Sequence, residues 1–265
     1  MTGRGDQRVE TSDTSILRVD DVTVAFGGLQ ANRNVTLTLQ PNERVGLIGP
    51  NGAGKTTLVS CICGEIQPKT GRIFLNGVNV TRWPTHKRFL EGLGRTFQIA
   101  NPFPALNALD AVALGPLART GNEEGALDSA RLALARLKID HFADTPMRSL
   151  NTVTTKLVEL ARLIASDVKV AILDELLAGL VPAERGFVLD VLEEVSAEAG
   201  WAVVMIEHLI HDVRRFCPRA IVLREGQIIA DGPTAQVLQD EEVIAAYLGS
   251  RWAELESAKA AEAIL

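Results

Sequence analysis

The fold is decided by residues 49–57, which read Gly49-Pro50-Asn51-Gly52-Ala53-Gly54-Lys55-Thr56-Thr57. This stretch matches the pattern G-x-x-x-x-G-K-[ST], and it follows a strand-like segment at 45–48 and opens a helical pattern from residue 55 to about 64. Glycines let successive backbone N–H groups surround a phosphate, and the N-terminus of the helix adds positive charge. We therefore expect a nucleotide site built from this loop, in which Lys55 reaches the β- and γ-phosphates and the Thr56 hydroxyl binds Mg²⁺.

Two adjacent acids, Asp174 and Glu175, follow the apolar segment 170–173. Open α/β sheets bind ligands at the carboxyl ends of their strands. Asp174 is therefore expected to hold Mg²⁺, directly or through water, and Glu175 to polarise the attacking water in phosphoryl transfer. The competing interpretation is a pair of hydrated acids at the end of a strand.

Two further polar residues follow strand-like segments. His208 comes after residues 202–206, from where it approaches the γ-phosphate from a third direction, and Gln98 comes after residues 94–97. Each residue taken singly is more typical of a structural role, so their assignment to the site depends on the motifs around them.

Strand-like and helical segments alternate along the chain, which predicts an α/β fold with a mostly parallel sheet. The strand-like segments are 16–26, 35–39, 45–48, 72–75, 168–173, 202–206, 221–223 and 227–230. Residues 101–150 are rich in Ala and Leu at helical spacing, so we expect a helical insertion that projects from the core. Residues 1–14 are polar and without periodicity, as in a flexible tail, and residues 251–265 read as a second, C-terminal tail.

Composition narrows the classes of function. The chain has 265 residues with 27 basic and 33 acidic side chains, a net charge of −6, and aromatics make up only 5%. Nucleic-acid binding is disfavoured, because it calls for a basic excess or for stacking aromatics. The three cysteines do not show the spacing of a disulfide framework, which is typical of a protein in a reducing compartment. No apolar run approaches the length of a membrane span. We expect a soluble intracellular protein whose role at a membrane comes through a partner.

The order of these motifs resembles the ATP-binding subunit of an ATP-binding-cassette (ABC) transporter over about residues 16–249. In that family the position of Phe26 carries an aromatic residue that stacks on adenine. Gln98 matches the Q-loop glutamine, which senses Mg²⁺ and the membrane subunit, and His208 matches the switch histidine. Asp174 and Glu175 match the Walker B pair. The resemblance implies that Glu175, His208 and Gln98 serve catalysis and that Thr56, Gln98 and Asp174 serve Mg²⁺.

The resemblance also implies the domain plan. One ABC ATP-binding domain is expected over residues 15–250, with a P-loop NTPase core, an N-terminal antiparallel β subdomain and a helical subdomain at about 99–165. Four segments look most like ATPases of branched-chain amino-acid uptake, although related importers of urea or amides are similar. They are Ala25-Phe26-Gly27-Gly28-Leu29, Gly94-Arg95-Thr96-Phe97-Gln98, Ile206-Glu207-His208 and Ala246-Tyr247-Leu248-Gly249.

A subunit of this kind would hydrolyse ATP at the cytoplasmic face of the membrane. Its partners would be a second ATPase subunit, transmembrane permease subunits and, indirectly, a solute-binding protein. The segment 102–106, just after Gln98, is the expected docking surface for the membrane partner, its alternative being an ordinary surface loop.

Some residues depart from the family pattern. The signature motif of the family has a glycine where this chain has Val153, within Leu150-Asn151-Thr152-Val153-Thr154-Thr155-Lys156. A β-branched side chain there is expected to crowd the γ-phosphate of a partner's nucleotide. Leu176 replaces a proline and Val181 a polar residue of the D-loop. We therefore predict an asymmetric heterodimer. The alternative is that Asn151, Thr152 and the helix N-terminus still bind phosphate well enough.

Two other functions remain open at this point. One is a nucleotide-binding regulatory subunit that hydrolyses little, which the altered signature favours and the intact Glu175 and His208 oppose. The other is a soluble ABC ATPase of DNA repair or ribosome function, which the acidic balance and the single phosphate loop disfavour.

Overall fold

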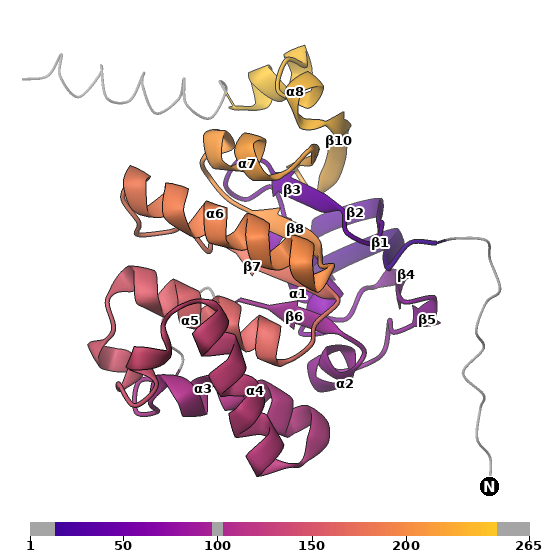
Figure 1. Ribbon diagram of the computed structural model, residues 1–265. Helices are drawn as coiled ribbons and strands as arrows, with labels where there is room; N and C mark the ends of the chain where they lie inside the picture. Colours follow the sequence, from indigo (N-terminus) through magenta and orange to yellow (C-terminus); the bar gives the residue numbers. More distant parts are fainter. Residues whose placement is uncertain (1–13, 97–102, 248–265) are drawn as a thin grey trace, which may run out of the picture.

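The computed structural model describes residues 14–96 and 103–247 of the chain. Two β-sheets and a lobe of helices make up this part, with the antiparallel sheet and the helical lobe on different sides of the larger sheet (Figure 1). The α/β fold class expected from the sequence is confirmed. The tails expected at 1–14 and 251–265 lie outside the described residues except for residue 14, and the exact domain bounds stay a prediction.

The smaller sheet is antiparallel and has the strand order β2-β1-β4-β5. Its strands are β1 (Leu17–Phe26), β2 (Leu29–Leu39), β4 (Thr70–Leu75) and β5 (Val78–Asn79). The two longest strands form a hairpin that turns at Gly27, whose φ of 57° suits glycine. Because pairing with β1 extends it, β2 begins at Leu29 and is longer than the expected strand 35–39.

The larger sheet has the order β10-β9-β3-β8-β7-β6. Five of its strands are parallel, and β10 pairs antiparallel at one edge. The strands are β3 (Arg44–Ile48), β6 (Leu93–Arg95), β7 (Val170–Asp174), β8 (Ala202–Ile206), β9 (Arg219–Arg224) and β10 (Gln227–Pro233). The parallel arrangement brings the carboxyl ends of β3, β7 and β8 to one edge, where the predicted site residues follow.

Helices cover both faces of this sheet. Helix α1 (Lys55–Cys63) packs between the two sheets, and α6 (Pro182–Ala199) and α7 (Ile210–Phe216) pack on the other face (Figure 1). The chain then forms α8 (Thr234–Val237) and is helical again over 241–247. Two buried clusters of apolar side chains, one on each side of the larger sheet, hold these layers together.

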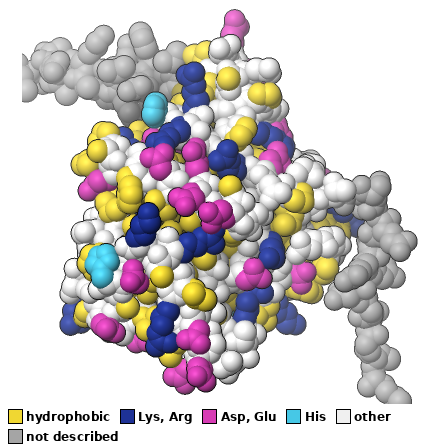
Figure 2. Space-filling model, in the orientation of Figure 1, with side chains coloured by type: hydrophobic (Ala, Val, Ile, Leu, Met, Phe, Trp, Pro, Cys, Tyr) yellow, Lys and Arg dark blue, Asp and Glu magenta, His cyan; other side chains and the backbone are white. Residues whose placement is uncertain are grey.

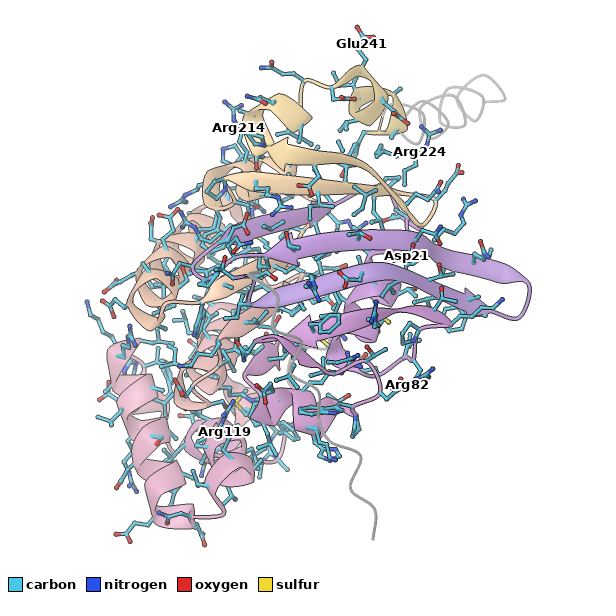
Figure 3. The ribbon with its side chains drawn as sticks, turned by 90° about the vertical axis from the view of Figure 1, so that its right-hand side faces the viewer. Asp21, Arg82, Arg119, Arg214, Arg224 and Glu241 are labelled. Carbon is cyan, nitrogen blue, oxygen red and sulfur yellow. The ribbon has the colours of Figure 1, made fainter. Side chains whose placement is uncertain are left out.

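The helical lobe contains α3 (Ala108–Thr120), α4 (Glu123–Arg136) and α5 (Thr152–Ala165). Each begins at an asparagine whose side-chain oxygen accepts a backbone N–H of the first turn, namely Asn107, Asn122 and Asn151. Arg119, labelled in Figure 3, joins the lobe to α2 (Thr85–Leu90) because it donates to the carbonyls of Phe89 and Leu90 at 2.8 and 3.2 Å.

Arg88 of α2 is fully buried and holds the end of α1. Its guanidinium donates to the carbonyls of Cys61 and Ile62 at 2.8 and 2.6 Å, and to those of Thr81 and Trp83 at 2.9 and 3.1 Å. Burial lowers the pKa of Arg88 from its ordinary value. Four carbonyl partners compensate the cost of burying this cation, so the C-terminal end of α1 is fixed by a side chain.

On the surface, acidic and basic side chains are interspersed over the face shown in Figure 2. Several pair, including Arg136 with Glu198 and Arg215 with Asp190. Within residues 14–96 and 103–247, every helix is too short or too polar to span a lipid bilayer.

Candidate functional site

The phosphate loop lies between β3 and α1 and is braced from two sides. The Gly226 N–H donates to the Ala53 carbonyl at 2.9 Å, and the Asn32 side-chain amide donates to the Gly54 carbonyl at 3.2 Å. A Cβ at Gly49 would lie 2.1 Å from the Leu223 carbonyl oxygen, and one at Gly54 would lie 2.4 Å from that of Ala31. Only glycine fits these two positions, and the loop is held in one conformation.

Lys55 begins α1 and is 7% exposed. Its Nζ donates to the carbonyls of Gly49 and Pro50 at 2.6 and 3.1 Å. Burial lowers the pKa of Lys55, while the charges of Glu175 and Asp174 raise it. The lysine therefore places a positive charge inside the loop, which a phosphate would balance, and a bound cation would balance the nearby carboxylates of Glu175 and Asp174.

A cavity of about 640 Å³ opens above this loop, a volume that suits a nucleotide. Phe26, 51% exposed at the end of β1, forms part of one wall. The other lining residues are Leu29, Gln30, Ala31, Arg33, Asn51, Gly52, Ala53, Gly54, Lys55, Thr56, Thr57, Glu175, His208 and Glu225. One space thus collects the predicted aromatic residue, most of the phosphate loop, the predicted water-polarising acid and the predicted switch histidine.

Asp174 ends β7 and its side chain is 1% exposed. Its Oδ2 accepts a hydrogen bond from Arg95 Nη2 at 2.6 Å, whereas its buried Oδ1 has no hydrogen-bond partner among the described residues. A buried carboxylate oxygen without a donor costs free energy unless a cation or water binds it. The free carboxylate oxygen and the exposed Thr56 hydroxyl are oxygen ligands of the kind that Mg²⁺ prefers, so these residues fit a magnesium ion.

Glu175 and His208 contact each other directly. His208 Nε2 lies 2.8 Å from Glu175 Oε1. The backbone of Glu175 has a φ of 52°, which is uncommon for a non-glycine residue, and its N–H donates to the Ile206 carbonyl at 2.9 Å. This backbone conformation places the carboxylate at the junction of β7 and β8. The sequence predicted both residues for the site but not the hydrogen bond between them.

Gln98 is outside the described residues. The residues that depart from the family pattern lie away from the cavity. The altered signature begins α5, where Asn151 Oδ1 accepts the Thr154 N–H at 2.8 Å, and its residues 151–153 are not among those that line the cavity. Val181 of the D-loop position is 56% exposed, and Leu176 is fully buried in the core. Val181 and the signature therefore do not line the chain's own cavity.

Sequence reasoning missed several residues around the site. Arg95 pairs with Asp174, Arg33 lines the cavity and donates to the Glu225 carbonyl at 3.0 Å, and the Tyr247 hydroxyl is hydrogen-bonded to the backbone of Gly49. Arg95 and Tyr247 both lie within segments that resembled uptake ATPases, and that resemblance was the available signal.

Comparison with known families shows to which protein family the chain belongs. The family model described as "ABC transporter" matches residues 32–178. The chain belongs to the ABC transporter family. It is an ABC ATPase, which binds nucleotide and hydrolyses ATP, as the motifs predicted. A second model, "Branched-chain amino acid ATP-binding cassette transporter", matches residues 227–253 of this ABC ATPase.

Curated relatives share nearly the full length. The "High-affinity branched-chain amino acid transport ATP-binding protein BraF" of Pseudomonas aeruginosa is 32% identical over 88% of this chain and 98% of its own length. The "Probable branched-chain amino acid transport ATP-binding protein LivG" of Archaeoglobus fulgidus is 29% identical over 91% and 98%. The "Lipopolysaccharide export system ATP-binding protein LptB" of Escherichia coli is 31% identical over 88% and 97%.

Solved structures agree with the fold. A nucleotide-free ATP-binding cassette from an ABC transporter superimposes with a TM-score of 0.81 at 27% identity, covering 88% of this chain and 98% of that one. A cassette in its ADP conformation gives a TM-score of 0.81 at 26% identity, covering 89% and 100%. Both likenesses cover most of this chain and nearly all of the solved one.

Proposed function

We propose that this ABC ATPase energises an importer for branched-chain or other amino acids. The observation that carries the proposal is the cavity that unites Phe26, Lys55, Glu175 and His208 in a chain whose residues 227–253 match the branched-chain cassette model. The named transport of BraF and LivG supports the same substrate class.

Within this proposal, residues 49–57 hold the nucleotide phosphates and Phe26 stacks on the base. Thr56, Asp174 and Gln98 hold Mg²⁺, which would neutralise charge on the phosphates. Glu175 polarises the attacking water, and His208 keeps the Glu175 carboxylate in place through the 2.8 Å hydrogen bond.

The partners in this proposal are transmembrane permease subunits and, through them, a solute-binding protein, with the ATPase peripheral at the cytoplasmic face of the membrane. A second cavity of about 1040 Å³ supports a docking place for the permease. It lies between α2 and β6 on one side and the helical lobe on the other, and Phe89, Phe103, Leu114 and Leu163 line it. Phe103 belongs to the segment 102–106, so the cavity borders the docking surface expected from the sequence at this residue.

The second ATPase subunit in this proposal is a different chain. Val153 lies in the first turn of α5, where the family has glycine, and its side chain packs partly against the core. Loss of one preorganised phosphate donor slows turnover by roughly 10²- to 10³-fold. The purified chain is therefore expected to hydrolyse ATP poorly as a homodimer. Brisk turnover of the pure chain that disappears in Glu175→Gln would contradict the heterodimer.

One observation favours a second candidate, a regulatory subunit with little hydrolysis. The same altered signature, residues 151–153, would leave one of the two sites of a dimer slow. ATP-dependent dimerisation without turnover, with permease subunits present, would decide for this candidate.

Uptake of radiolabelled leucine tests the main proposal. A strain that lacks the gene is complemented with the wild type, with Lys55→Ala or with Lys69→Ala, an exposed lysine just before β4 that serves as the matched control. Uptake is expected with the wild type and the control and is lost with Lys55→Ala. Leucine uptake independent of Lys55, with Lys55-dependent uptake of urea or an amide instead, would overturn the substrate class.

A further inference from the structure

Arg95 connects the metal-binding carboxylate to the helix of the phosphate loop. It is the last residue of β6, which pairs parallel with β7 so that Arg95 lies opposite Ile172. One arm, Nη2, lies 2.6 Å from Asp174 Oδ2, and the other arm, Nη1, lies 2.7 Å from Glu65 Oε1. The guanidinium thus bridges two carboxylates that belong to different parts of the fold.

The first arm acts on a buried charge. The Asp174 side chain is 1% exposed, and a carboxylate in such a place needs a counter-charge. The planar guanidinium has fixed donor directions, so it determines which way the carboxylate faces. With Oδ2 bound to Arg95, the Oδ1 atom is left buried and without a hydrogen-bond partner among the described residues.

The second arm fixes Arg95 itself. Glu65 follows α1, and its Oε2 accepts a hydrogen bond from Ser60 Oγ at 2.7 Å. Ser60 lies in the last turns of α1, the helix that begins with Lys55. The Arg95 side chain is 17% exposed and its guanidinium is bonded on both sides, so it has little freedom to move away from Asp174.

The backbone supports the same arrangement. The Asp174 N–H donates to Thr96 Oγ1 at 2.9 Å, and the Thr96 N–H donates to the Ile172 carbonyl at 2.9 Å. Residues 95 and 96 therefore hold the end of β7 through both the main chain and the side chain of Asp174. Arg95 and Asp174, which these contacts bring together, are 79 positions apart in the sequence.

We propose that Arg95 is a positioning residue of the nucleotide site, which orients the Asp174 carboxylate so that Oδ1 faces Mg²⁺. The inference rests on the proposed role of Asp174 as a holder of Mg²⁺. Partners that orient metal-binding groups change metal affinity by roughly 10- to 100-fold. Arg95 would supply this contribution through its 2.6 Å hydrogen bond to Asp174 Oδ2.

The test is nucleotide binding to the purified full chain, measured by calorimetry with ATP in excess Mg²⁺ and again in EDTA. Arg95→Gln is expected to weaken binding roughly 10- to 100-fold in Mg²⁺ and to change it less than about twofold in EDTA. Arg95→Lys is expected to lose part of the Mg²⁺ effect, because an ammonium lacks the planar fork. Arg82→Gln is the matched control, since it makes the same change at an exposed arginine outside the contact with Asp174, and it is expected to bind as the wild type does.

Equal losses in Mg²⁺ and in EDTA would assign Arg95 a merely structural role, and an unchanged or stronger Mg²⁺ effect would also overturn the proposal. If Arg95→Gln does not fold, Arg95→Lys decides, and a full wild-type Mg²⁺ effect in that variant overturns it. A wild type whose ATP affinity does not depend on Mg²⁺ would instead refute the role of Asp174, which is a separate failure.

Discussion

His208 Nε2 and Glu175 Oε1 are 2.8 Å apart, so the histidine fixes the carboxylate that faces the nucleotide cavity. Glu175→Gln keeps the shape of the side chain and removes its ability to take a proton. Turnover of the assembled transporter is expected to fall roughly 10²- to 10⁴-fold, while ATP affinity stays within a few fold. An ATPase assay beside a binding titration measures both. A variant that loses affinity as much as turnover would show that Glu175 binds nucleotide instead.

Glu159 of α5 gives the chain a pH-dependent stability. It is 3% exposed, neither of its carboxylate oxygens has a hydrogen-bond partner among the described residues, and burial raises its pKa to about 7. A raised pKa means that the folded state holds the proton more tightly than the unfolded state does. Protonated Glu159 therefore adds to the free energy of unfolding fully below about pH 4.5, and this addition is lost as the pH rises through about 7.

Glu159→Gln removes the ionisable group and with it the loss of stability above about pH 7. Urea unfolding is expected to give a variant more stable than the wild type by about 2–3 kcal/mol at pH 8, with the gain shrinking toward pH 5. The matched control is Glu124→Gln, which changes an exposed glutamate of α4 and is expected to have little effect at either pH. The same gain at both pH values would exclude the titration of Glu159 as the cause.

Tyr247 supports the phosphate loop from outside. Its hydroxyl is hydrogen-bonded to the backbone of Gly49, whose carbonyl accepts the Lys55 ammonium at 2.6 Å. Tyr247→Phe keeps the ring and removes one hydrogen bond worth about 1 kcal/mol, so the free energy of unfolding is expected to fall by about that amount. ATP affinity is expected to fall by up to roughly fivefold, because the phosphate loop loses part of its support. Burial raises the pKa of Tyr247, and because the chain has one tyrosine, ultraviolet absorbance reports that ionisation directly. Unchanged affinity in Tyr247→Phe would mean that the loop needs no such support.

Val153→Gly tests the origin of the proposed asymmetry. Glycine restores the close backbone approach that the family signature permits, at a cost of about 1 kcal/mol in helix stability. ATPase turnover of the purified chain is expected to rise roughly 10- to 100-fold. Val153→Ala is the control, because it removes bulk without freeing the backbone. If the two variants hydrolyse ATP equally fast, backbone approach at residue 153 is not what limits the homodimer.

Local pattern was enough to predict the phosphate loop, the strand that delivers Asp174 and the α/β fold, because each depends on residues close in sequence. The start of β2 at Leu29 was missed, since pairing with β1 rather than its own alternation makes residues 29–34 a strand. The contacts of Arg95 with Asp174 and of Tyr247 with Gly49 were missed for the same kind of reason. They depend on which distant segments become neighbours in the fold, strands in the first case and a helix and the phosphate loop in the second, and a single sequence carries no pattern for that.

The hydrogen bonds from Arg88 to four backbone carbonyls limit how far α1 can move during a transport cycle. Two of these carbonyls, those of Cys61 and Ile62, belong to the C-terminal end of α1, and the other two, those of Thr81 and Trp83, lie outside the helix. Arg88 thus ties this end of α1 to a neighbouring segment, and we expect α1 to keep its position when ATP binds or leaves. Any movement that accompanies ATP binding is then expected in other parts of the subunit. On this view α1 is the stationary element of the nucleotide site, relative to which the other elements would move.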